Sequence, residues 1–367
     1  MKINLIIFLS KFGMGGAGNS IFKLCKGLKK KKYNISIICL KNCSYDKKFK
    51  KIGINVHKIK SNKTFFAMPK VLEIAKSLIS KKYQKNIFMS NIHYTNILSL
   101  IFLRNLHNLK IVLIERTPLM ELNIYFNFSD TVKKFFIKLL IYLLYKFSDS
   151  IICNSTSISK HFKLKYNLNT KTIFPPSVIN FSQNSSKVYK KNTTLIIVTI
   201  CRLTKEKGLA VLIKALSLLK FNNYKLLIVG DGVEKLRLKR LSENLGVKQK
   251  IKYFGFTKDI KSILKKSNLY VNSSYFEGFP NSVVEAINFG LPIISSQSYG
   301  GINEILLNGK CGTIFKNGDS VDLANKIQNF YNNPKKFFLK TKLAKRNIRR
   351  FTLEENISNY ENLFHNL

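Results

Sequence analysis

The sequence lacks tryptophan and has few acidic residues. Only 19 Asp and Glu stand against 63 Lys and Arg among its 367 residues, which gives a formal net charge of +44. Such an excess suits anionic partners: nucleic acid, an acidic membrane surface or phosphorylated substrates. The lysines are spread over the whole chain among many Asn and Ile residues, however, and an AT-rich genome produces the same pattern. Selected anion binding and codon bias both stand as explanations of the charge.

Cysteine is also sparse. The six cysteines form no CxxC pair, and none has a histidine at a spacing that suits zinc, so we expect neither a zinc site nor a disulfide scaffold. We interpret them as reduced core thiols of a cytosolic protein. They are Cys25, Cys39, Cys43, Cys153, Cys201 and Cys311.

Long apolar runs are missing as well. The longest later run, residues 135–147, is interrupted by Lys138 and is far shorter than the roughly 20 residues of a membrane-spanning helix. The opening MKINLIIFLS superficially resembles a signal peptide, but its apolar run is short and no small-residue cleavage site follows. We therefore expect a buried first strand there, no transmembrane segment, and only peripheral contact with any membrane.

What the sequence does contain is an alternation of short β-branched apolar runs with longer segments of helical period. This alternation predicts an α/β protein with parallel sheets covered by helices on both faces. The expected strands are residues 2–9, 34–40, 54–59, 86–89, 110–114, 150–153, 170–174, 195–199, 225–229, 251–254, 269–272, 292–295 and 312–314. The expected helices are residues 17–31, 67–82, 95–105, 129–147, 157–164, 208–219, 233–245, 258–265, 282–289, 302–307 and 320–332.

Two prolines, Pro175 and Pro176, interrupt this pattern, and a polar segment rich in Ser, Asn and Lys follows them. We therefore expect two doubly wound, Rossmann-like domains, residues 1–176 and 194–367, joined by a linker at 177–193. The last helix is a candidate to pack back on the first domain. Open parallel sheets bind ligands outside the carboxyl ends of their strands, so two such domains facing each other would form a cleft.

The strongest local signal is YFEGFPNSVVEAINFG, between two expected strands. Glu277 lies in the loop, and Glu285 lies in the first turns of the following helix. The free amides of Asn281, Ser282 and Val283 at the start of that helix suit a diphosphate. A carboxylate slightly deeper accepts hydrogen bonds from vicinal hydroxyls, as acids do in dinucleotide folds. The alternative is that both acids are ordinary solvated charges.

Two other loops follow expected strands and open helices. In CRLTKEKG, the cations Arg202 and Lys207 are placed to converge on one phosphate pair and to neutralise a leaving group. In GMGGAG, the glycines do not fit the GxGxxG register, and no acid ends the next strand. We therefore expect a loop that brings backbone close to a phosphate or sugar rather than a dinucleotide site.

Together, EGFPNSVVEA with the following GLPIISSQSYGGINEIL, the RLTKEKG segment and the GMGGAG loop resemble glycosyltransferase family 4, the retaining nucleotide-sugar enzymes of GT-B fold. The resemblance covers nearly the whole chain. It implies that Glu285 binds the nucleotide ribose and that Glu277 approaches the hydroxyls of the donor sugar. It also implies that Arg202 and Lys207 hold the diphosphate.

In the first domain, the resemblance places Gly15 and Gly16 against the phosphates. The segments IVLIERTP and NFSDTVKKFFIKLLIYLLYKFSDSIICNS look most like bacterial enzymes that extend lipid-linked glycans. Many family members have a histidine where the strand at 110–114 ends, whereas this chain has Glu115 and Arg116. One of these two is expected to meet the sugar or the acceptor. His93 is a further catalytic candidate, with a purely structural role as the alternative.

The resemblance implies retaining transfer of a hexose or N-acetylhexosamine, with UDP favoured over GDP as the carrier, to a glycan hydroxyl in polysaccharide, glycoconjugate or lipopolysaccharide biosynthesis. The donor's own phosphate oxygen would deprotonate the acceptor on the same face. Arg202, Lys207 and the helix N-terminus at Ser282 would stabilise the leaving diphosphate. The chain has no Asp-x-Asp motif to clamp a metal, so we expect neither a metal nor a cofactor.

The expected partners are a nucleotide-sugar donor, a polyprenyl-linked glycan acceptor and the anionic inner face of the cell membrane, which the protein would bind peripherally from the cytoplasm. The membrane expectation rests on residues 130–147, where an apolar helix face accompanies basic residues for anionic headgroups. The alternative for that segment is a core helix with a solvated edge. The apolar residues are Val132, Phe135, Phe136, Leu139, Leu140, Leu143, Leu144 and Phe147, and the basic ones are Lys133, Lys134, Lys138 and Lys146.

The competing interpretation of the whole chain is a nucleic-acid or other polyanion-binding protein, suggested by the charge of +44 and by 12% aromatic residues. Such a protein needs a basic face or a recognisable reading element. The sequence contains no zinc finger, RNP-type strand or helix-turn-helix signature. We therefore expect no nucleic-acid partner.

Overall fold

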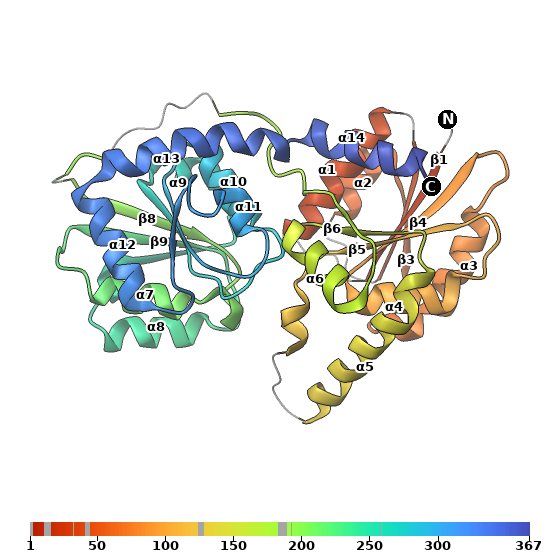
Figure 1. Ribbon diagram of the computed structural model, residues 1–367, viewed down its shortest axis with the longest axis horizontal. Helices are drawn as coiled ribbons and strands as arrows, with labels where there is room; N and C mark the ends of the chain where they lie inside the picture. The colour runs from red at the N-terminus through yellow and green to blue at the C-terminus, as the bar shows by residue number, and fades with distance from the viewer. Residues whose placement is uncertain are drawn as a thin grey trace. The chain divides into compact units, whose positions relative to one another are not determined.

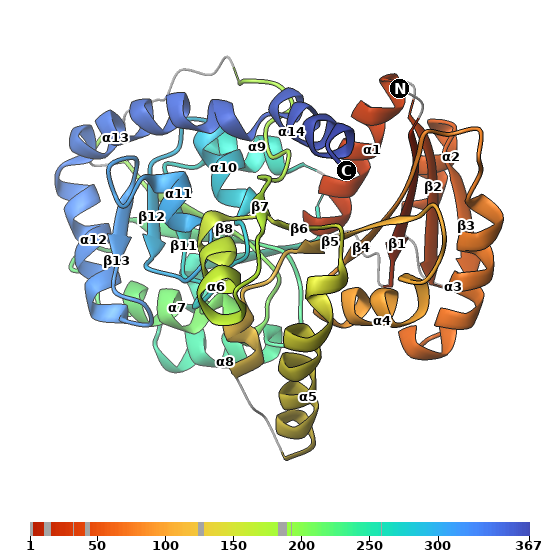
Figure 2. The same cartoon turned by 45° about the vertical axis from the view of Figure 1, so that its right-hand side comes forward.

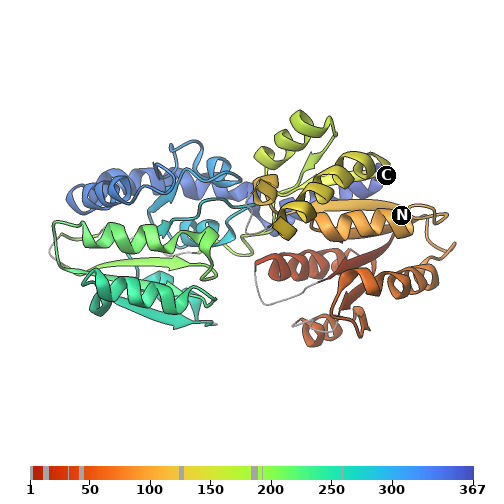
Figure 3. The same ribbon diagram turned by 90° about the horizontal axis from the view of Figure 1, so that it is seen from below.

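The computed structural model describes residues 3–10, 16–31, 33–40, 45–123, 128–182, 189–191, 193–257 and 259–367 (Figure 1). The chain divides into two compact units. Unit 1 consists of Met1–Pro176 and Phe351–Leu367, and unit 2 consists of Ser177–Arg350. Each unit is built around one parallel sheet with helices on both sides of it (Figure 3).

Unit 1 has a seven-stranded parallel sheet in the order β3-β2-β1-β4-β5-β6-β7. Its strands are β1 (Ile3–Leu9), β2 (Asn34–Leu40), β3 (Asn55–Ile59), β4 (Lys85–Asn91), β5 (Lys110–Glu115), β6 (Ser150–Cys153) and β7 (Lys171–Thr172). Its helices are α1 (Gly16–Lys30), α2 (Asp46–Lys51), α3 (Thr64–Leu78), α4 (His93–Leu103), α5 (Phe128–Leu144), α6 (Thr156–Tyr166) and α14 (Leu353–His365), with 3-10 turns η1 (Leu119–Asn123) and η2 (Tyr145–Phe147).

The central strand β1 is apolar at nearly every position because both of its faces are buried. Successive side chains of a strand point to opposite faces. Ile6 and Phe8 accordingly join a core with residues of α3, α4, α5 and α6, whereas Leu5 and Ile7 join a second core with residues of α1 and α14. Figure 2 shows α14, the last helix of the chain, beside α1.

Unit 2 has a six-stranded parallel sheet in the order β10-β9-β8-β11-β12-β13. Its strands are β8 (Leu195–Ile200), β9 (Tyr224–Val229), β10 (Ile251–Gly255), β11 (Leu269–Asn272), β12 (Ile293–Ser296) and β13 (Thr313–Phe315). Its α-helices are α7 (Leu209–Ser217), α8 (Lys235–Asn244), α9 (Ile260–Lys266), α10 (Asn281–Asn288), α11 (Ile302–Leu306), α12 (Ser320–Asn332) and α13 (Pro334–Asn347), with 3-10 turns η3 (Lys205–Lys207), η4 (Lys248–Lys250) and η5 (Ile348–Phe351, which ends in unit 1).

Polar caps fix where several helices begin. The carboxylate of Asp319 accepts hydrogen bonds from the amides of Val321 and Asp322 at the start of α12. The hydroxyl of Thr352 accepts one from the amide of Glu355 at the start of α14. Such caps satisfy amides that have no partner inside the helix.

The predicted fold class is confirmed: both units are α/β and doubly wound. Most expected elements lie within three residues of the observed ones. α2, α13 and the bounds of α14 were not predicted. The lysine-rich sequences of α2 and α13 obscure the apolar period. The expected linker is partly packed: Val178 is buried, and the hydroxyl of Ser177 donates to the side chain of Asn281 in α10.

Candidate functional site in unit 2

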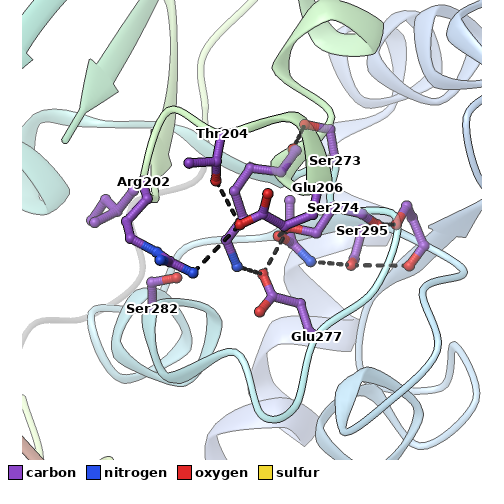
Figure 4. Close-up of polar contacts among 12 residues, drawn as sticks. Arg202, Thr204, Glu206, Ser273, Ser274, Glu277, Ser282 and Ser295 are labelled. Carbon is purple, nitrogen blue, oxygen red and sulfur yellow. Dashed lines mark hydrogen bonds and ion pairs between the residues drawn. The ribbon is translucent and has the colours of Figure 1, made fainter. Parts of the chain in front are cut away.

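Two loops meet at the carboxyl edge of the unit 2 sheet, because β8 and β11 are neighbouring parallel strands. The first loop is the predicted CRLTKEKG segment after β8, and the second is the SSYFEGFP segment between β11 and α10. Figure 4 shows their side chains pointing toward one another. The residues that the sequence singled out in these loops are therefore brought together.

An ion pair joins the loops. The ammonium of Lys207 donates to Oε1 of Glu277 at 2.8 Å, and the hydroxyl of Ser274 donates to the same oxygen at 2.7 Å (Figure 4). The side chains of Lys207 and Glu277 are each only 13% exposed. A charge pair shielded from water to this degree holds its geometry better than one on the surface.

Arg202 lies beside this pair but is far more open, with 66% of its side chain exposed. Its Nη2 is 3.4 Å from Oε1 of Glu206, an oxygen that also accepts a hydrogen bond of 2.6 Å from Thr204. Exposed ion pairs contribute about 0–1 kcal/mol, so an anionic ligand displaces Glu206 from Arg202 at little cost.

Backbone contacts lock the two loops together. The amide of Tyr275 donates to the carbonyl of Glu206 at 2.9 Å, and the hydroxyl of Ser273 donates to the carbonyl of Lys207 at 3.0 Å. Gly208 makes this approach possible: its φ is +59°, and a Cβ atom there would lie 2.1 Å from the carbonyl oxygen of Ser273. Only glycine fits this position without displacing the backbone.

The loop after β12 supports Glu277 from behind. The amide of Glu277 donates to the carbonyl of Tyr299 at 2.9 Å, and the amide of Gly301 donates to the carbonyl of Gly278 at 3.0 Å. Gly300 has a φ of +123°, and a Cβ atom there would lie 1.5 Å from the carbonyl oxygen of Glu277. The Gly-Gly pair of SQSYGGINE therefore serves the site by allowing close contact of two backbones.

The start of α10 differs from the expectation of three free amides. The amide of Asn281 donates to the carbonyl of Phe279, and that of Val283 donates to the carbonyl of Pro280, both at 3.0 Å. A tight turn ahead of the helix thus already occupies two of the three groups. The hydroxyl of Ser282 accepts a 2.8 Å hydrogen bond from Tyr270, whose burial raises its pKa.

Glu285 lies within α10, partly buried, between the buried side chains of Val284 and Ala286. It is four residues, or just over one helical turn, beyond Asn281, the first residue of the helix. Four residues span about 6 Å along a helix axis. A ligand that extends from the first turn of α10 along the helix is therefore within reach of this carboxylate.

In unit 1, the structure corrects the expectation for Glu115. Its side chain is fully buried, and its carboxylate lies 2.6 Å from Nδ1 of His93 while accepting hydrogen bonds from Tyr145 at 2.5 Å and Asn96 at 2.7 Å. A carboxylate so enclosed does not meet a sugar or an acceptor. Its position is instead that of a residue that orients His93.

His93 is also buried, at the first residue of α4. Burial by itself would lower the pKa of His93, but the adjacent carboxylate of Glu115 raises it above its ordinary value. The preceding residue, Ile92, has a φ of +76°, which is rare for a β-branched side chain and costs about 1–3 kcal/mol. The fold maintains this strained backbone immediately before the histidine.

The other candidates in unit 1 follow β1 and β5 in the sequence. Gly15 lies outside the described residues, and Gly16 is the first residue of α1, where its carbonyl accepts a hydrogen bond from Ser20. Arg116 follows β5, is partly buried, and donates through Nε to the side chain of Asn91 at 2.9 Å. Within the described ranges, no group of three or more His, Cys, Asp or Glu side chains is arranged to hold a metal ion.

Sequence reasoning missed several contributors to the site: Ser274 on Glu277, Glu206 on Arg202, Tyr270 on Ser282, and the Gly300 contact. The two serines that directly follow β11 were a usable signal, because polar residues at the carboxyl end of a parallel strand lie at its ligand edge. No sequence signal indicated the role of Tyr270, because a tyrosine within an apolar strand is typical of the buried core.

Comparison with known proteins agrees with this geometry. Residues 180–349 match the family model described as Glycosyl transferases group 1. An uncharacterized glycosyltransferase of Methanocaldococcus jannaschii is 35% identical over 177 residues, which cover 44% of this chain and 43% of that protein. The matches to the first curated relatives thus span less than half the length of those proteins.

Two further relatives cover most of the chain. The Campylobacter jejuni enzyme GalNAc-alpha-(1->4)-GalNAc-alpha-(1->3)-diNAcBac-PP-undecaprenol alpha-1,4-N-acetyl-D-galactosaminyltransferase is 25% identical over 351 residues, which cover 89% of this chain and 88% of that enzyme. The crystal structure of Anabaena Alr3699/HepE in complex with UDP has a TM-score of 0.78 at 18% identity and covers 100% of both chains. Residues 180–349 of the chain therefore match the glycosyl transferases group 1, and its two Rossmann-like units have the GT-B fold.

Proposed function

We propose that the protein is a retaining glycosyltransferase of family 4 that transfers a hexose or N-acetylhexosamine from a nucleotide diphosphate, preferably UDP, to a hydroxyl of a glycan. The observation that carries the proposal is the contact between the two loops of unit 2. It places Lys207 against the carboxylate of Glu277 and Arg202 against that of Glu206, both at the carboxyl edge of the sheet.

In this proposal the donor diphosphate lies against Arg202 and Lys207. These cations compensate the negative charge that grows on the leaving nucleoside diphosphate, which is the largest electrostatic demand of the reaction. Lys207 is already held by Glu277, so it is in position before the donor arrives. Glu277 in turn accepts hydrogen bonds from hydroxyls of the sugar, and Glu285 accepts them from the ribose.

The first experiment tests this assignment by donor binding. UDP, GDP and their sugar conjugates are titrated into the wild-type protein, into Lys207→Ala and into Lys214→Ala, a matched lysine variant of α7. We expect UDP to bind to the wild-type protein and to the control, with an affinity at least about tenfold lower for Lys207→Ala. Equal affinity for all three proteins, or preference for duplex DNA over UDP at physiological salt, contradicts the proposal.

For the acceptor, we propose a polyprenyl-linked glycan at the inner face of the cell membrane. The name of the Campylobacter jejuni relative describes an undecaprenol-linked substrate, which supports this choice. None of the described helices combines the length and the apolar content that spanning a bilayer requires. The proposed contact with the membrane is therefore made by surface residues.

Helix α5 carries the evidence for such a surface. It buries only Ile137 and Ile141, so the core-helix alternative does not account for it. Figures 1 and 2 show its first half extending beyond the other helices of unit 1. Its large apolar side chains are exposed in unusual number for a soluble protein, with Phe135 61% exposed. They are Phe128, Val132, Phe135, Phe136, Leu139, Tyr142 and Leu143.

The chemistry of this face is that of an interfacial helix, with aromatic side chains for the acyl boundary and lysines for anionic headgroups. Lys133 and Lys134 lie among these aromatic residues, although Lys134 also pairs with Asp130 at 2.6 Å. We test the face by sedimentation with vesicles that contain anionic lipid. Phe135→Ser combined with Phe136→Ser should abolish binding, and triple Lys→Glu substitution at 133, 134 and 138 should reverse its dependence on lipid charge.

The matched control for charge is a triple Lys→Glu variant of α9 at Lys261, Lys265 and Lys266, exposed lysines of unit 2. It changes the net charge by the same amount but leaves α5 intact, so we expect it to sediment like the wild-type protein. If the wild-type protein does not bind anionic vesicles at low salt, the membrane proposal is wrong. A glycan without a lipid anchor is then the better proposal for the acceptor.

A further inference from the structure

A chain of buried polar side chains leads through unit 2 to Glu277. Asn272 and Ser295 are register partners on the neighbouring strands β11 and β12, and the side-chain amide of Asn272 lies 3.0 Å from Oγ of Ser295. Ser274 follows Asn272 by two residues and contacts Glu277 (Figure 4). Asn272, Ser274 and Ser295 are all buried. Burial of polar groups is costly unless they are hydrogen-bonded, so each of these groups needs a partner of the right kind.

The hydroxyl of Ser274 has two acceptors beside it but only one hydrogen. Its Oγ lies 2.7 Å from Oε1 of Glu277 and 3.1 Å from Oδ1 of Asn272. A serine hydroxyl donates one hydrogen bond and accepts up to two. Because a charged acceptor makes the shorter and stronger bond, the hydrogen lies toward the carboxylate. The contact with Asn272 is then a hydrogen bond only if Asn272 is the donor.

The amide of Asn272 supplies this donor when its nitrogen faces Ser274. The nitrogen and oxygen of an asparagine amide exchange places in a half-turn that moves no neighbouring atom. The oxygen of Asn272 then faces Ser295, whose hydroxyl donates to it in preference to the more distant carbonyl of Ser296, 3.2 Å away. The opposite orientation leaves the buried oxygen of Asn272 without a donor, which is unfavourable.

The chain occupies one oxygen of Glu277 and leaves the other for a ligand. Oε1 accepts hydrogen bonds from Ser274 at 2.7 Å and from Lys207 at 2.8 Å. In the ranges that the structure describes, no donor contacts Oε2 (Figure 4). Each oxygen of a carboxylate accepts about two hydrogen bonds. Oε1 is therefore fully used, whereas Oε2 has room for two hydroxyl donors.

We propose that Ser274 and Asn272 are positioning residues for the donor sugar. With Ser295 they form a chain of donors that runs in one direction, from Ser295 to Asn272, to Ser274 and to Oε1 of Glu277, and it orients the carboxylate so that Oε2 receives sugar hydroxyls. That the ligand is a sugar rests on the proposed function, whereas the direction of the chain does not. Because Lys207 also holds Oε1, loss of the chain should weaken sugar binding more than diphosphate binding.

The first arm of the experiment needs no ligand. The side-chain amide of Asn272 is followed by ¹⁵N–¹H NMR in the full chain and is identified by its loss in Asn272→Asp. If this amide donates to Ser274, then Ser274→Ala removes its acceptor and shifts the amide protons more than Ser295→Ala does. An equal or larger shift in Ser295→Ala means that the amide donates to Ser295, and it overturns the proposed direction.

The second arm compares the affinities of UDP, UDP-glucose, UDP-galactose and the two corresponding UDP-N-acetylhexosamines. Ser274→Ala removes the last donor of the chain, and Asn272→Asp keeps the size of the side chain but cannot donate. In both variants, the affinity for the tightest UDP-sugar relative to that for UDP should fall about tenfold, because a charged acceptor is no longer held in place. The matched control is Ser242→Ala, which changes a fully buried serine of α8 outside both loops and should keep the wild-type ratio.

The remaining outcomes overturn one proposal or the other. An unchanged ratio in both variants refutes the positioning role. Parallel losses of UDP and UDP-sugar affinity refute it too, since a loop that has merely lost its structure behaves in that way. Wild-type protein that binds no UDP refutes the proposed function, while the first arm still decides the direction of the chain. If thermal melts show that Ser274→Ala does not fold, Ser274→Cys replaces it, because a thiol is only a weak donor.

Discussion

At the scale of single residues, the site of unit 2 separates two cations by their surroundings. Lys207 is held by Glu277 and shielded from water, whereas Arg202 is exposed and only weakly held by Glu206. The first therefore contributes a fixed charge and the second a movable one. This difference predicts that similar substitutions at these positions change turnover to different extents.

Arg202→Ala should reduce turnover by about 100-fold or more, because it removes a charge that stabilises the leaving diphosphate. Glu206→Gln should reduce turnover by no more than about fivefold, since the exposed pair that it breaks is worth about 0–1 kcal/mol. Steady-state kinetics of both variants test the ranking. Equal losses would mean that Glu206 acts on the substrate directly and does not merely hold Arg202.

Glu285→Gln should weaken the binding of the nucleotide sugar by about 1.5–3 kcal/mol, or one to two powers of ten, because a charged acceptor for ribose hydroxyls is lost. The partly buried position of Glu285 should leave folding intact. Calorimetric titration of UDP and a thermal melt of the variant provide the measurement and its control. An unchanged affinity would remove Glu285 from the site.

The buried pair of His93 and Glu115 predicts a pH dependence of stability. Glu115 raises the pKa of His93 against the effect of burial, so the folded state binds the proton more tightly than the unfolded state. The stabilisation is then complete below the ordinary histidine value of about 6.5 and is lost as the pH rises through the raised pKa, with a slope of at most about 1.4 kcal/mol per pH unit.

Glu115→Gln provides the check. The pKa of the His93 imidazole, followed by NMR, should lie above its ordinary value in the wild-type protein and should fall in the variant, where only the charge of Glu121 still opposes the effect of burial. The difference in free energy of unfolding between the two proteins should be largest below pH 6.5 and should shrink as the pH rises. A difference that grows with pH would show that His93 is neutral in the folded state.

At the scale of elements, strands were easier to predict from the sequence than the site. The strands at 34–40, 150–153 and 269–272 have the expected bounds, because β-branched runs buried on both faces leave a strong pattern. The hydrogen-bond partners of an individual polar side chain, in contrast, depend on three-dimensional contacts. Glu115 after β5 looked like a ligand-facing acid, yet its partners come from α4 and η2, which no local pattern reveals.

The loops after β8 and β11 supply a prediction about glycine. Gly208→Ala should lower the free energy of unfolding by more than Gly246→Ala, although both positions have positive φ, +59° and +68°. A Cβ atom at 208 meets the carbonyl of Ser273, whereas one at 246 meets nothing within 4 Å. The control variant, Gly246→Ala, should therefore lose only about 1 kcal/mol of unfolding free energy, the conformational cost of a side chain at positive φ.

Urea unfolding of the two glycine variants measures this difference directly. We also expect Gly208→Ala to reduce turnover while Gly246→Ala leaves it unchanged, because the first separates Lys207 from Glu277 and the second is remote from both loops. Equal losses of stability would show that the contact between the loops is not tight.

At the scale of the whole molecule, each unit has a chemistry of its own. Unit 2 holds the paired loops proposed for the donor, and unit 1 holds the exposed apolar face of α5. The net charge of +44 strengthens every attraction to an anion, so specific sites must be distinguished from general attraction by salt. Donor binding, which uses the shielded Lys207, should survive physiological salt better than binding to vesicles.

The last prediction concerns the response of the two units to the donor. UDP at about 100 times its dissociation constant should stabilise the unit that binds it by about 2.7 kcal/mol. Because units that unfold separately give separate transitions, calorimetry of the intact chain should show one transition moving and the other staying in place. The shift, and transfer activity with it, should persist in excess EDTA, because Arg202 and Lys207 supply the positive charge that the diphosphate requires. A shift that vanishes in EDTA and returns with magnesium would assign part of that charge to a metal ion. A shift of both transitions would mean that UDP also binds unit 1, or that the two units unfold together.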